Sequence, residues 1–539
     1  MERVGQVTKS ASALIVAKLV TSVMMFLLAI VVNRKLGPST AGIYVYAIAL
    51  YTIFQVIPDF GIGNILIRDV SPRRGRTQRY LKNVVVIRVA LGAVSFLLLM
   101  FANILGSVAQ RSNALTGERF WAVFVVAFCL LLEQPLSNSF AEVFISLERQ
   151  MVVAYVYIIM GFLRLGLSLY VILSGARHAI VLLVGIYLVT IIYSIFHFYL
   201  VYRRWLKREG RALARAELDS TSTGDAPAVA EDPSPFAVAI FPERIEVPEP
   251  TGGTGMDTRL WRYLLKSSWP LAVAAAGVVV YAGLDIPMVS WIAGNRASGL
   301  YNAGAMYAKA FVFLTIAVNM AILPAISLIA DRKPERLGEV WERMLHYALV
   351  LVLPVTVIVP VLARPALILQ KHNYIQAWSV TWLTMAAINF TVLSTISYLF
   401  FIVINRQKKI VQIIAVGVAA KVAMNTVFIS VWGYRGAAIT VAVTEVLAFF
   451  LIYYLLSRYM GHRFSFLKFA GAPAVSLAAL YAAAFTLEKL LTSNAVLASI
   501  EYAILISVII VLIYAVLAFS TRALTRSGLN ELNELLKVE

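Results

Sequence analysis

Five basic side chains interrupt long apolar segments of the chain. They are Lys18, Arg88, Arg164, Lys309 and Lys421. A charged side chain at the centre of a bilayer costs roughly 2.5–3.5 kcal/mol, so such a residue faces either a wet cavity or a partner of opposite charge. We expect all five cations to line a cavity that binds an anionic ligand. Lys18, Arg164 and Lys421 are its central members, because they lie near the middle of their segments.

Two other interpretations of these cations remain open. A central cation can belong to a structural ion pair inside a helix bundle. Arg88 lies near the predicted start of its segment, so its long side chain can also reach the membrane interface. If the cavity forms, arginine offers a phosphate a planar fork of donors, whereas lysine acts as a compact point charge. The two phosphates of a lipid carrier would match such a site.

Besides Glu501, which lies near one end of its segment, four acidic side chains lie in apolar segments, and three of them are close to a proline. The acids are Asp59, Glu133, Asp285 and Glu445, and the neighbouring prolines are Pro58, Pro135 and Pro287. A proline bends a helix and frees a backbone carbonyl. Freed carbonyls beside a carboxylate can bind sodium or relay a proton, so these acids are candidate ion-coupling residues, with Asp285 and Glu133 preferred. Alternatively, each carboxylate neutralises a neighbouring cation.

Membrane-spanning helices must position these charges. Hydrophobic residues make up 60% of the chain, charged residues make up 14%, and the mean hydropathy is +0.82. A helix of about 20 apolar residues crosses the hydrocarbon core. Because the apolar runs are continuous rather than alternating, they predict helices and exclude a β-barrel. We therefore predict an all-α polytopic membrane protein with about 14 transmembrane helices, near residues 9–32, 41–64, 84–106, 119–141, 151–173, 179–202, 261–291, 300–328, 344–363, 376–404, 410–432, 436–457, 466–487 and 500–521.

The sequence repeats itself 257 residues along. Lys9, Gly37, Gly42 and Tyr44 return as Lys266, Gly294, Gly299 and Tyr301, and Arg164 corresponds to Lys421, whereas Lys18 corresponds to Ala275. Each copy holds six apolar segments, an even number, so the two copies have the same orientation in a bilayer. Parallel repeats of this kind are typical of transporters, with the substrate site between the halves. We expect an asymmetric cavity with more positive charge on the first half.

Four regions follow from the repeat. They are a first six-helix bundle at 1–203, a cytoplasmic linker at 204–258, a second six-helix bundle at 259–458, and an accessory helix pair with a tail at 459–539. The linker is acidic and rich in proline, and such a composition does not bury a core.

The net charge of +19 is distributed as expected for a membrane protein rather than a nucleic-acid-binding protein. Most Lys and Arg residues lie in segments that would be cytoplasmic if the N-terminus is inside, which predicts cytoplasmic N- and C-termini in the inner membrane. The basic loop 65–82 is expected to contact anionic lipid headgroups. No phosphate-binding loop, metal-ligand cluster or catalytic pair is recognisable, so we expect neither an enzyme nor a resident cofactor.

Several short motifs are shared with a known family. They are Leu36-Gly37-Pro38 with Gly42-Ile43-Tyr44, Asp59-Phe60-Gly61-Ile62-Gly63 with Arg68, Glu148-Arg149-Gln150, and Gly433 with Gly436-Ala437-Ala438. With these motifs the chain resembles the polysaccharide (Wzx-like) flippases of the multidrug/oligosaccharidyl-lipid/polysaccharide exporter (MOP) superfamily. The resemblance implies a V-shaped pair of bundles that flips an undecaprenyl-pyrophosphate-linked oligosaccharide to the outer leaflet. It also implies a cationic lumen and cycling driven by an ion gradient, with Na⁺ or H⁺ as the coupling ion. The expected partners are the lipid-linked oligosaccharide, membrane lipids, and a polysaccharide polymerase or glycosyltransferases.

Other functions remain open at this point. A flippase for lipid II, the peptidoglycan precursor, would have the same span number and a cationic lumen. A multidrug antiporter fits less well, because the central charges here are mainly positive. A membrane-bound glycan transferase or polymerase would need a large catalytic loop, and none is apparent. A scaffold without transport activity would not explain the cations at mid-span.

Overall fold

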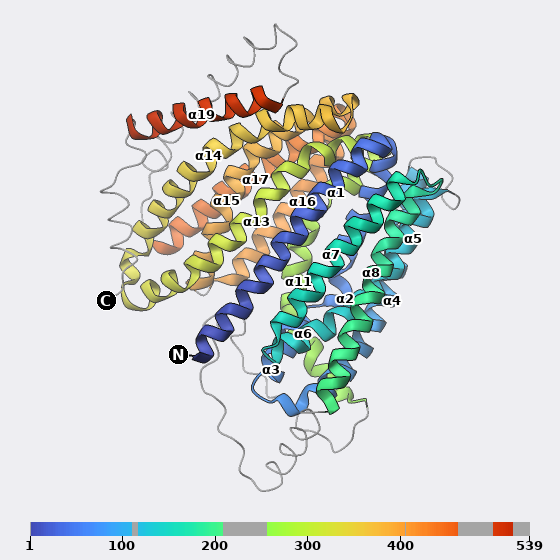
Figure 1. Cartoon of the computed structure of the whole chain (residues 1–539). Helices are drawn as coiled ribbons and strands as arrows, with labels where there is room; N and C mark the ends of the chain where they lie inside the picture. Colours follow the sequence, from blue (N-terminus) through green and yellow to red (C-terminus); the bar gives the residue numbers. More distant parts are fainter. Residues whose placement is uncertain (1, 110–116, 208–255, 405, 462–499, 521–539) are drawn as a thin grey trace. The chain divides into compact units, whose positions relative to one another are not determined.

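The computed structural model describes residues 2–109, 117–207, 256–404, 406–461 and 500–520 (Figure 1), and every regular element in them is a helix. The first half contains α1 (Glu2–Phe54), α2 (Val56–Asp59), α3 (Ile62–Val70), η1 (Arg74–Arg76), α4 (Thr77–Ala109), α5 (Glu118–Leu130), η2 (Glu133–Asn138), α6 (Ser139–Ser146), α7 (Gln150–Leu173) and α8 (Ala179–Trp205). The second half contains α11 (Thr258–Gly283), α12 (Asp285–Ala293), α13 (Asn295–Arg332), η4 (Pro334–Arg336), α14 (Leu337–Gln370), η5 (His372–Ala377), α15 (Trp378–Val403), α16 (Gln407–Trp432), α17 (Tyr434–Met460) and α19 (Ile500–Ser520).

The predicted all-α membrane architecture is confirmed. In the described residues, 10 helices are long and apolar enough to cross a membrane. The number of 14 spans stays a prediction, and the span expected at 466–487 lies outside the described residues. The span expected at 9–32 and the first part of the one expected at 41–64 form one run, α1, which is kinked at Gly37, and the rest of the second span lies in α2 and the start of α3. The positive φ of 76° at Gly37 suits glycine, because glycine has no Cβ to clash.

Two helices are bent at prolines whose freed carbonyls find new donors. Pro58 leaves the carbonyl of Phe54 without its helical partner, and the hydroxyl of Ser95 on α4 donates to it at 2.7 Å. Pro354 does the same to Val350 on α14, where the Tyr514 hydroxyl of α19 donates at 2.6 Å. Both acceptors are therefore satisfied within the protein, as a bilayer interior requires.

The chain forms two compact units. Unit 1 comprises residues 1–35 and 43–291, and unit 2 comprises residues 36–42 and 292–539. The predicted bundles at 1–203 and 259–458 stay a prediction, and the compact units have different limits because α11 packs on α2, α3 and α4 of unit 1. Most of the predicted linker at 204–258 lies outside the described residues. The described residues on either side of it, Lys207 and Met256, both belong to unit 1.

Each unit has its own apolar core. In unit 1, one cluster is built around Phe144 and Phe198, and another surrounds Leu130. The core of unit 2 lies between α14, α15 and α17, with Trp341 and Phe400 fully buried. These cores fix α7 and α8, or α15 and α17, side by side, and so determine which polar residues of the spans meet.

Within unit 2, the turn at 36–42 meets the start of α13 through two glycines. A Cβ placed on Gly42 would lie 1.8 Å from the carbonyl oxygen of Asn295, and a Cβ on Gly299 would lie 2.0 Å from that of Pro38. The internal repeat maps Gly42 onto Gly299 and Pro38 onto Asn295. The contact is therefore reciprocal, each copy presenting a glycine to a backbone carbonyl of the other.

Candidate functional site

Arg164 lies half-buried on α7 of unit 1 and is held by two residues of α8. Its Nε donates to the Oγ1 of Thr190 at 2.9 Å, and its guanidinium carbon lies 4.2 Å from the ring centroid of Tyr187. The Thr190 hydroxyl in turn donates to the backbone carbonyl of Tyr187 at 2.9 Å. Within the described part of the chain, neither terminal nitrogen of Arg164 has a hydrogen-bond partner. One edge of this guanidinium is thus occupied and the other is available.

The surroundings of Arg164 contain a carboxylate and further tyrosines. Glu133 begins the π-helical turn η2, and its charge interacts with that of Arg164. No ion pair within 4.0 Å joins them among the described residues, and the Oε2 of Glu133 is buried without a hydrogen-bond partner. Tyr44 and Tyr157 are electrostatic neighbours of Arg164. A π-helical turn inside a span is frequent at functional sites, and here it brings a predicted coupling acid near a predicted cation.

Arg88 has a different environment, because it is fully buried and both of its terminal nitrogens are paired, although its Nε has no partner within the described residues. Its two terminal nitrogens donate to both oxygens of Glu142 at 2.7 and 2.8 Å. It also donates to Asp59 at 3.3 Å and to the hydroxyl of Ser139 at 2.8 Å. Arg88 therefore does not reach the membrane interface. Its environment is that of a structural ion pair inside the bundle. In this structure Arg88 is engaged in ion pairs with Glu142 and Asp59, and its predicted role in ligand binding stays a prediction.

Sequence reasoning missed Glu142. It lies on α6, one residue after the predicted span 119–141, and no proline or repeat drew attention to it. A Cβ on Gly63 would lie 2.0 Å from its Oε1, so the second glycine of the Gly61-Ile62-Gly63 motif makes room for this carboxylate. The available signal was the need of a buried arginine for a carboxylate partner.

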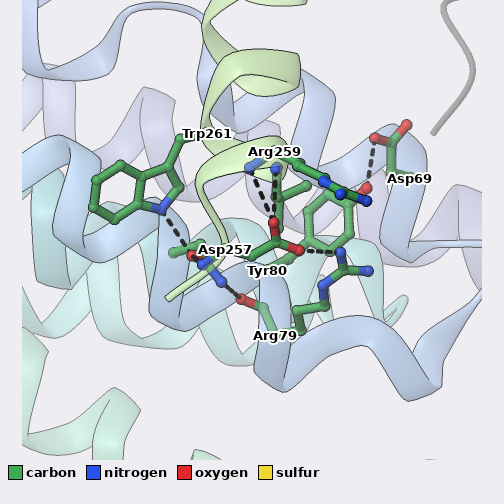
Figure 2. Close-up of polar contacts among 8 residues, drawn as sticks. Asp69, Arg79, Tyr80, Asp257, Arg259 and Trp261 are labelled. Atoms are coloured by element: carbon green, nitrogen blue, oxygen red, sulfur yellow. Dashed lines mark hydrogen bonds and ion pairs between the residues drawn. The ribbon is translucent and has the colours of Figure 1, made fainter. Parts of the chain in front are cut away.

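A second polar cluster fixes the start of α11 to α4 (Figure 2). Asp257 caps α11 by accepting from the backbone amides of Arg259 and Leu260 at 3.0 and 3.2 Å, and it forms an ion pair with Arg79. The Asn83 side-chain oxygen accepts from the Asp257 amide at 2.9 Å and from the Trp261 indole at 2.7 Å. We call Arg79, Asn83, Asp257 and Trp261 the α11 clamp. It attaches α11 to unit 1.

The ionised form of Asp257 is favoured in the clamp. Burial raises the pKa of this carboxyl, but hydrogen bonds from Arg79 and from the backbone amides outweigh it, so the pKa lies below its ordinary value. The clamp therefore contributes stability above the unfolded-state pKa and loses it as the pH falls through the lowered value.

An adjacent aspartate extends the polar contacts of this region. The hydroxyls of Tyr80 and Tyr263 both donate to the Oδ2 of Asp69 at 3.0 Å. Arg68 pairs with Asp69 at 2.8 Å and donates to the Tyr263 hydroxyl at 2.7 Å. Two arginines of the predicted lipid-contacting loop 65–82, Arg68 and Arg79, are thus engaged within unit 1.

The remaining predicted residues are distributed over both units. Lys18 is exposed on α1, and Asp285 is 5% exposed at the start of α12 in unit 1. In unit 2, Lys309 is exposed on α13, Lys421 is 3% exposed on α16, and Glu445 is half-buried on α17. Of the predicted set, the structure brings Arg164 near Glu133 and pairs Arg88 with Asp59.

A known family resembles the chain in sequence, and solved structures resemble it in fold. The family model described as "Polysaccharide biosynthesis protein" matches residues 7–220 and 244–330, more than half of the chain. No curated protein matches the chain. Among solved structures, an inward closed conformation of the lipid II flippase MurJ has a TM-score of 0.62 at 13% identity and covers 94% of this chain and 98% of that one.

Two further solved structures agree with this result. A multidrug resistance MATE family transporter of the MOP superfamily, in an inward-facing conformation, has a TM-score of 0.57 at 12% identity and covers 83% of this chain and 98% of that one. A MOP superfamily transporter from Pyrococcus furiosus has a TM-score of 0.51 at 12% identity, with 84% and 96% covered. At such identities the likeness establishes the fold, which is that of MOP superfamily transporters.

Proposed function

Because the chain belongs to the polysaccharide biosynthesis protein family and has the fold of MOP superfamily transporters, we propose that it is a flippase. Its substrate would be a polyprenyl-pyrophosphate-linked oligosaccharide, moved from the inner to the outer leaflet by alternating access. The product would serve the synthesis of a surface polysaccharide.

The observation that carries the proposal is the state of Arg164. A cation inside an apolar helix is costly, and a protein keeps it where the charge is used. Arg164 is half-buried, held on one edge by Thr190, and keeps two unpaired donors in the described structure. A pyrophosphate headgroup offers the oxygens that such a pair of donors binds. Lys421 and Lys18 are proposed as further cations that attract the headgroup.

The proposal extends to coupling and surroundings. The protein would lie in the inner membrane with both termini in the cytoplasm. Na⁺ or H⁺ would drive its cycle, with Glu133, Asp285 and Glu445 as candidate coupling acids; Asp59 is less suited, because it pairs with Arg88. A polysaccharide polymerase or glycosyltransferases would act before or after the flipping step.

A lipid II flippase is the second candidate. The observation in its favour is that the MurJ structure covers 94% of this chain with a TM-score of 0.62. A headgroup with a pyrophosphate would occupy the same site, so Arg164 does not distinguish the two substrates. Rescue of a strain depleted of its lipid II flippase would favour this candidate, and rescue of surface polysaccharide alone would favour the first.

The experiment replaces Arg164 in cells whose own copy of the gene is deleted. Removing a charge-assisted hydrogen bond costs about 1.5–3 kcal/mol, which is roughly a ten- to hundredfold loss of affinity. We expect Arg164→Ala to lower surface polysaccharide and to leave lipid-linked oligosaccharide on the inner leaflet, at normal membrane abundance.

The matched control is Arg177→Ala, which removes the same charge from an exposed position. It should leave the glycan output unchanged. Full glycan output from the Arg164 variant would contradict the proposed site.

A further inference from the structure

The geometry around Arg164 assigns a positioning role to two residues that the sequence did not single out. We propose that Thr190 and Tyr187 hold the guanidinium so that a phosphate group binds end-on, to Nη1 and Nη2, and not side-on through Nε. We call these two residues the Arg164 cradle. The inference rests on the proposed function, because it concerns how the same arginine meets an anionic headgroup.

Thr190 determines which edge of the guanidinium is occupied. Its hydroxyl hydrogen is committed to the carbonyl of Tyr187 at 2.9 Å, so its oxygen faces Arg164 as an acceptor. The Nε hydrogen is donated to that oxygen at 2.9 Å. Thr190 is fully buried, and a committed hydroxyl in a packed helix does not turn away easily. Side-on binding, which needs the Nε hydrogen, is therefore closed to a ligand.

Tyr187 determines the plane of the guanidinium. A separation of 4.2 Å between the guanidinium carbon and the ring centroid is well inside the range of cation–π attraction. With one edge and one face held, the remaining edge is the place where a ligand oxygen can be bound.

The charge next to the cradle does not occupy that edge. Glu133 interacts with the charge of Arg164 but forms no ion pair with it within the described residues. A phosphate would therefore not have to displace a formed ion pair before it binds. A free arginine loses side-chain entropy when it binds a ligand, and the cradle has already restricted that freedom.

The test measures binding of farnesyl diphosphate, a soluble isoprenyl pyrophosphate, to the full chain in lipid nanodiscs, with farnesol as the uncharged control ligand. Thr190→Val removes the acceptor at nearly constant volume, and Tyr187→Leu removes the ring. Each should weaken diphosphate binding about tenfold, while the affinity for farnesol stays the same. Thr190→Ser keeps the hydroxyl, and Tyr187→Phe keeps the aromatic ring. The diphosphate affinity of each should stay within about twofold of that of the unmodified protein.

The decisive comparison is made in the Arg164→Ala background. If the cradle acts through Arg164, adding Thr190→Val or Tyr187→Leu to Arg164→Ala should change diphosphate affinity less than about twofold. Full, additive losses in that background, or equal losses for diphosphate and farnesol, would overturn the positioning role. Should Thr190→Val fail to fold, the contrast between Tyr187→Leu and Tyr187→Phe decides by itself.

The same data separate the inference from the proposed function. If Arg164→Ala leaves diphosphate binding unchanged, Arg164 does not grip the headgroup and the proposed function loses its support. If Arg164→Ala weakens binding while the cradle variants do not, the function stands and only the end-on geometry is wrong.

Discussion

Two arginines of unit 1 have similar sequence environments but different hydrogen-bond partners. Arg88 and Arg164 each interrupt an apolar helix, yet Arg88 uses both terminal nitrogens on Glu142, whereas Arg164 uses only its Nε. The difference arises from the neighbouring helix, which offers a carboxylate to one and a hydroxyl to the other. A buried ion pair of the first kind holds elements together, because breaking it leaves a charge without compensation.

The Arg88 ion pair should therefore be a stability determinant. Glu142→Gln removes the bidentate carboxylate and leaves only Asp59, at 3.3 Å, to balance Arg88. Loss of one partner of a buried pair costs about 3–5 kcal/mol. We expect a markedly lower melting temperature of the purified protein in nanodiscs.

The matched control for this variant is Glu118→Gln, whose carboxylate is 35% exposed and faces His178. It should melt close to the unmodified protein. Equal melting temperatures for the two variants would show that the Arg88 pair is not structural.

At the scale of the elements, three glycines allow neighbouring helices to approach closely. Gly42 and Gly299 each meet a backbone carbonyl of the other repeat, and Gly63 makes room for Glu142. The repeat of the two glycines is visible in the sequence. Their mutual contact is not visible, because it depends on how two distant segments cross.

The contacts of Gly42 and Gly299 with backbone carbonyls predict that glycine-to-alanine substitutions differ in their effect on stability. Gly42→Ala and Gly299→Ala each insert a methyl group onto a carbonyl oxygen, and overpacking of this kind costs about 1–3 kcal/mol or more. Both should lower the melting temperature. Gly166→Ala on α7 adds the same methyl group where nothing lies within 4 Å, so it should be neutral or slightly stabilising. A uniform response of the three variants would contradict these contacts.

The limits of sequence reasoning follow from the same contrast. Hydropathy and glycine positions are local properties, so the all-helical fold and the break at Gly37 could be predicted. The cradle and Glu142 could not, since Thr190 and Glu142 stand out only once α8 faces α7 and α6 faces α4. Arg164 was found because an arginine in an apolar span is costly wherever it lies.

On the scale of the whole molecule, the chain changes unit at three places. They lie between residues 35 and 36, between 42 and 43, and between 291 and 292. The acidic segment after α8 is not among them, because the α11 clamp returns the chain to unit 1. Because the helices on either side of this segment, α8 and α11, belong to the same unit, the segment does not connect the two units.

Topology is the prediction that belongs to this scale. With Cys129 replaced by Ala, single cysteines are placed at Gln78 and Ser174, which are both exposed. The positive-inside rule places residue 78 in the cytoplasm and residue 174 outside. A membrane-impermeant maleimide should label Ser174→Cys in intact cells, and Gln78→Cys only after permeabilisation. The reverse pattern would invert the proposed direction of flipping.

The hydrogen bond between Tyr514 and the Val350 carbonyl gives the C-terminal helix a specific role. The proline that bends α14 leaves an acceptor that lipid tails cannot satisfy, and α19 supplies the missing donor. A chain that ended before residue 500 would lack this donor, and because Pro354 has no N–H, the Val350 carbonyl would need water or another molecule as its donor. The last described helix, α19, thus supplies the hydrogen-bond donor that Pro354 removes from α14.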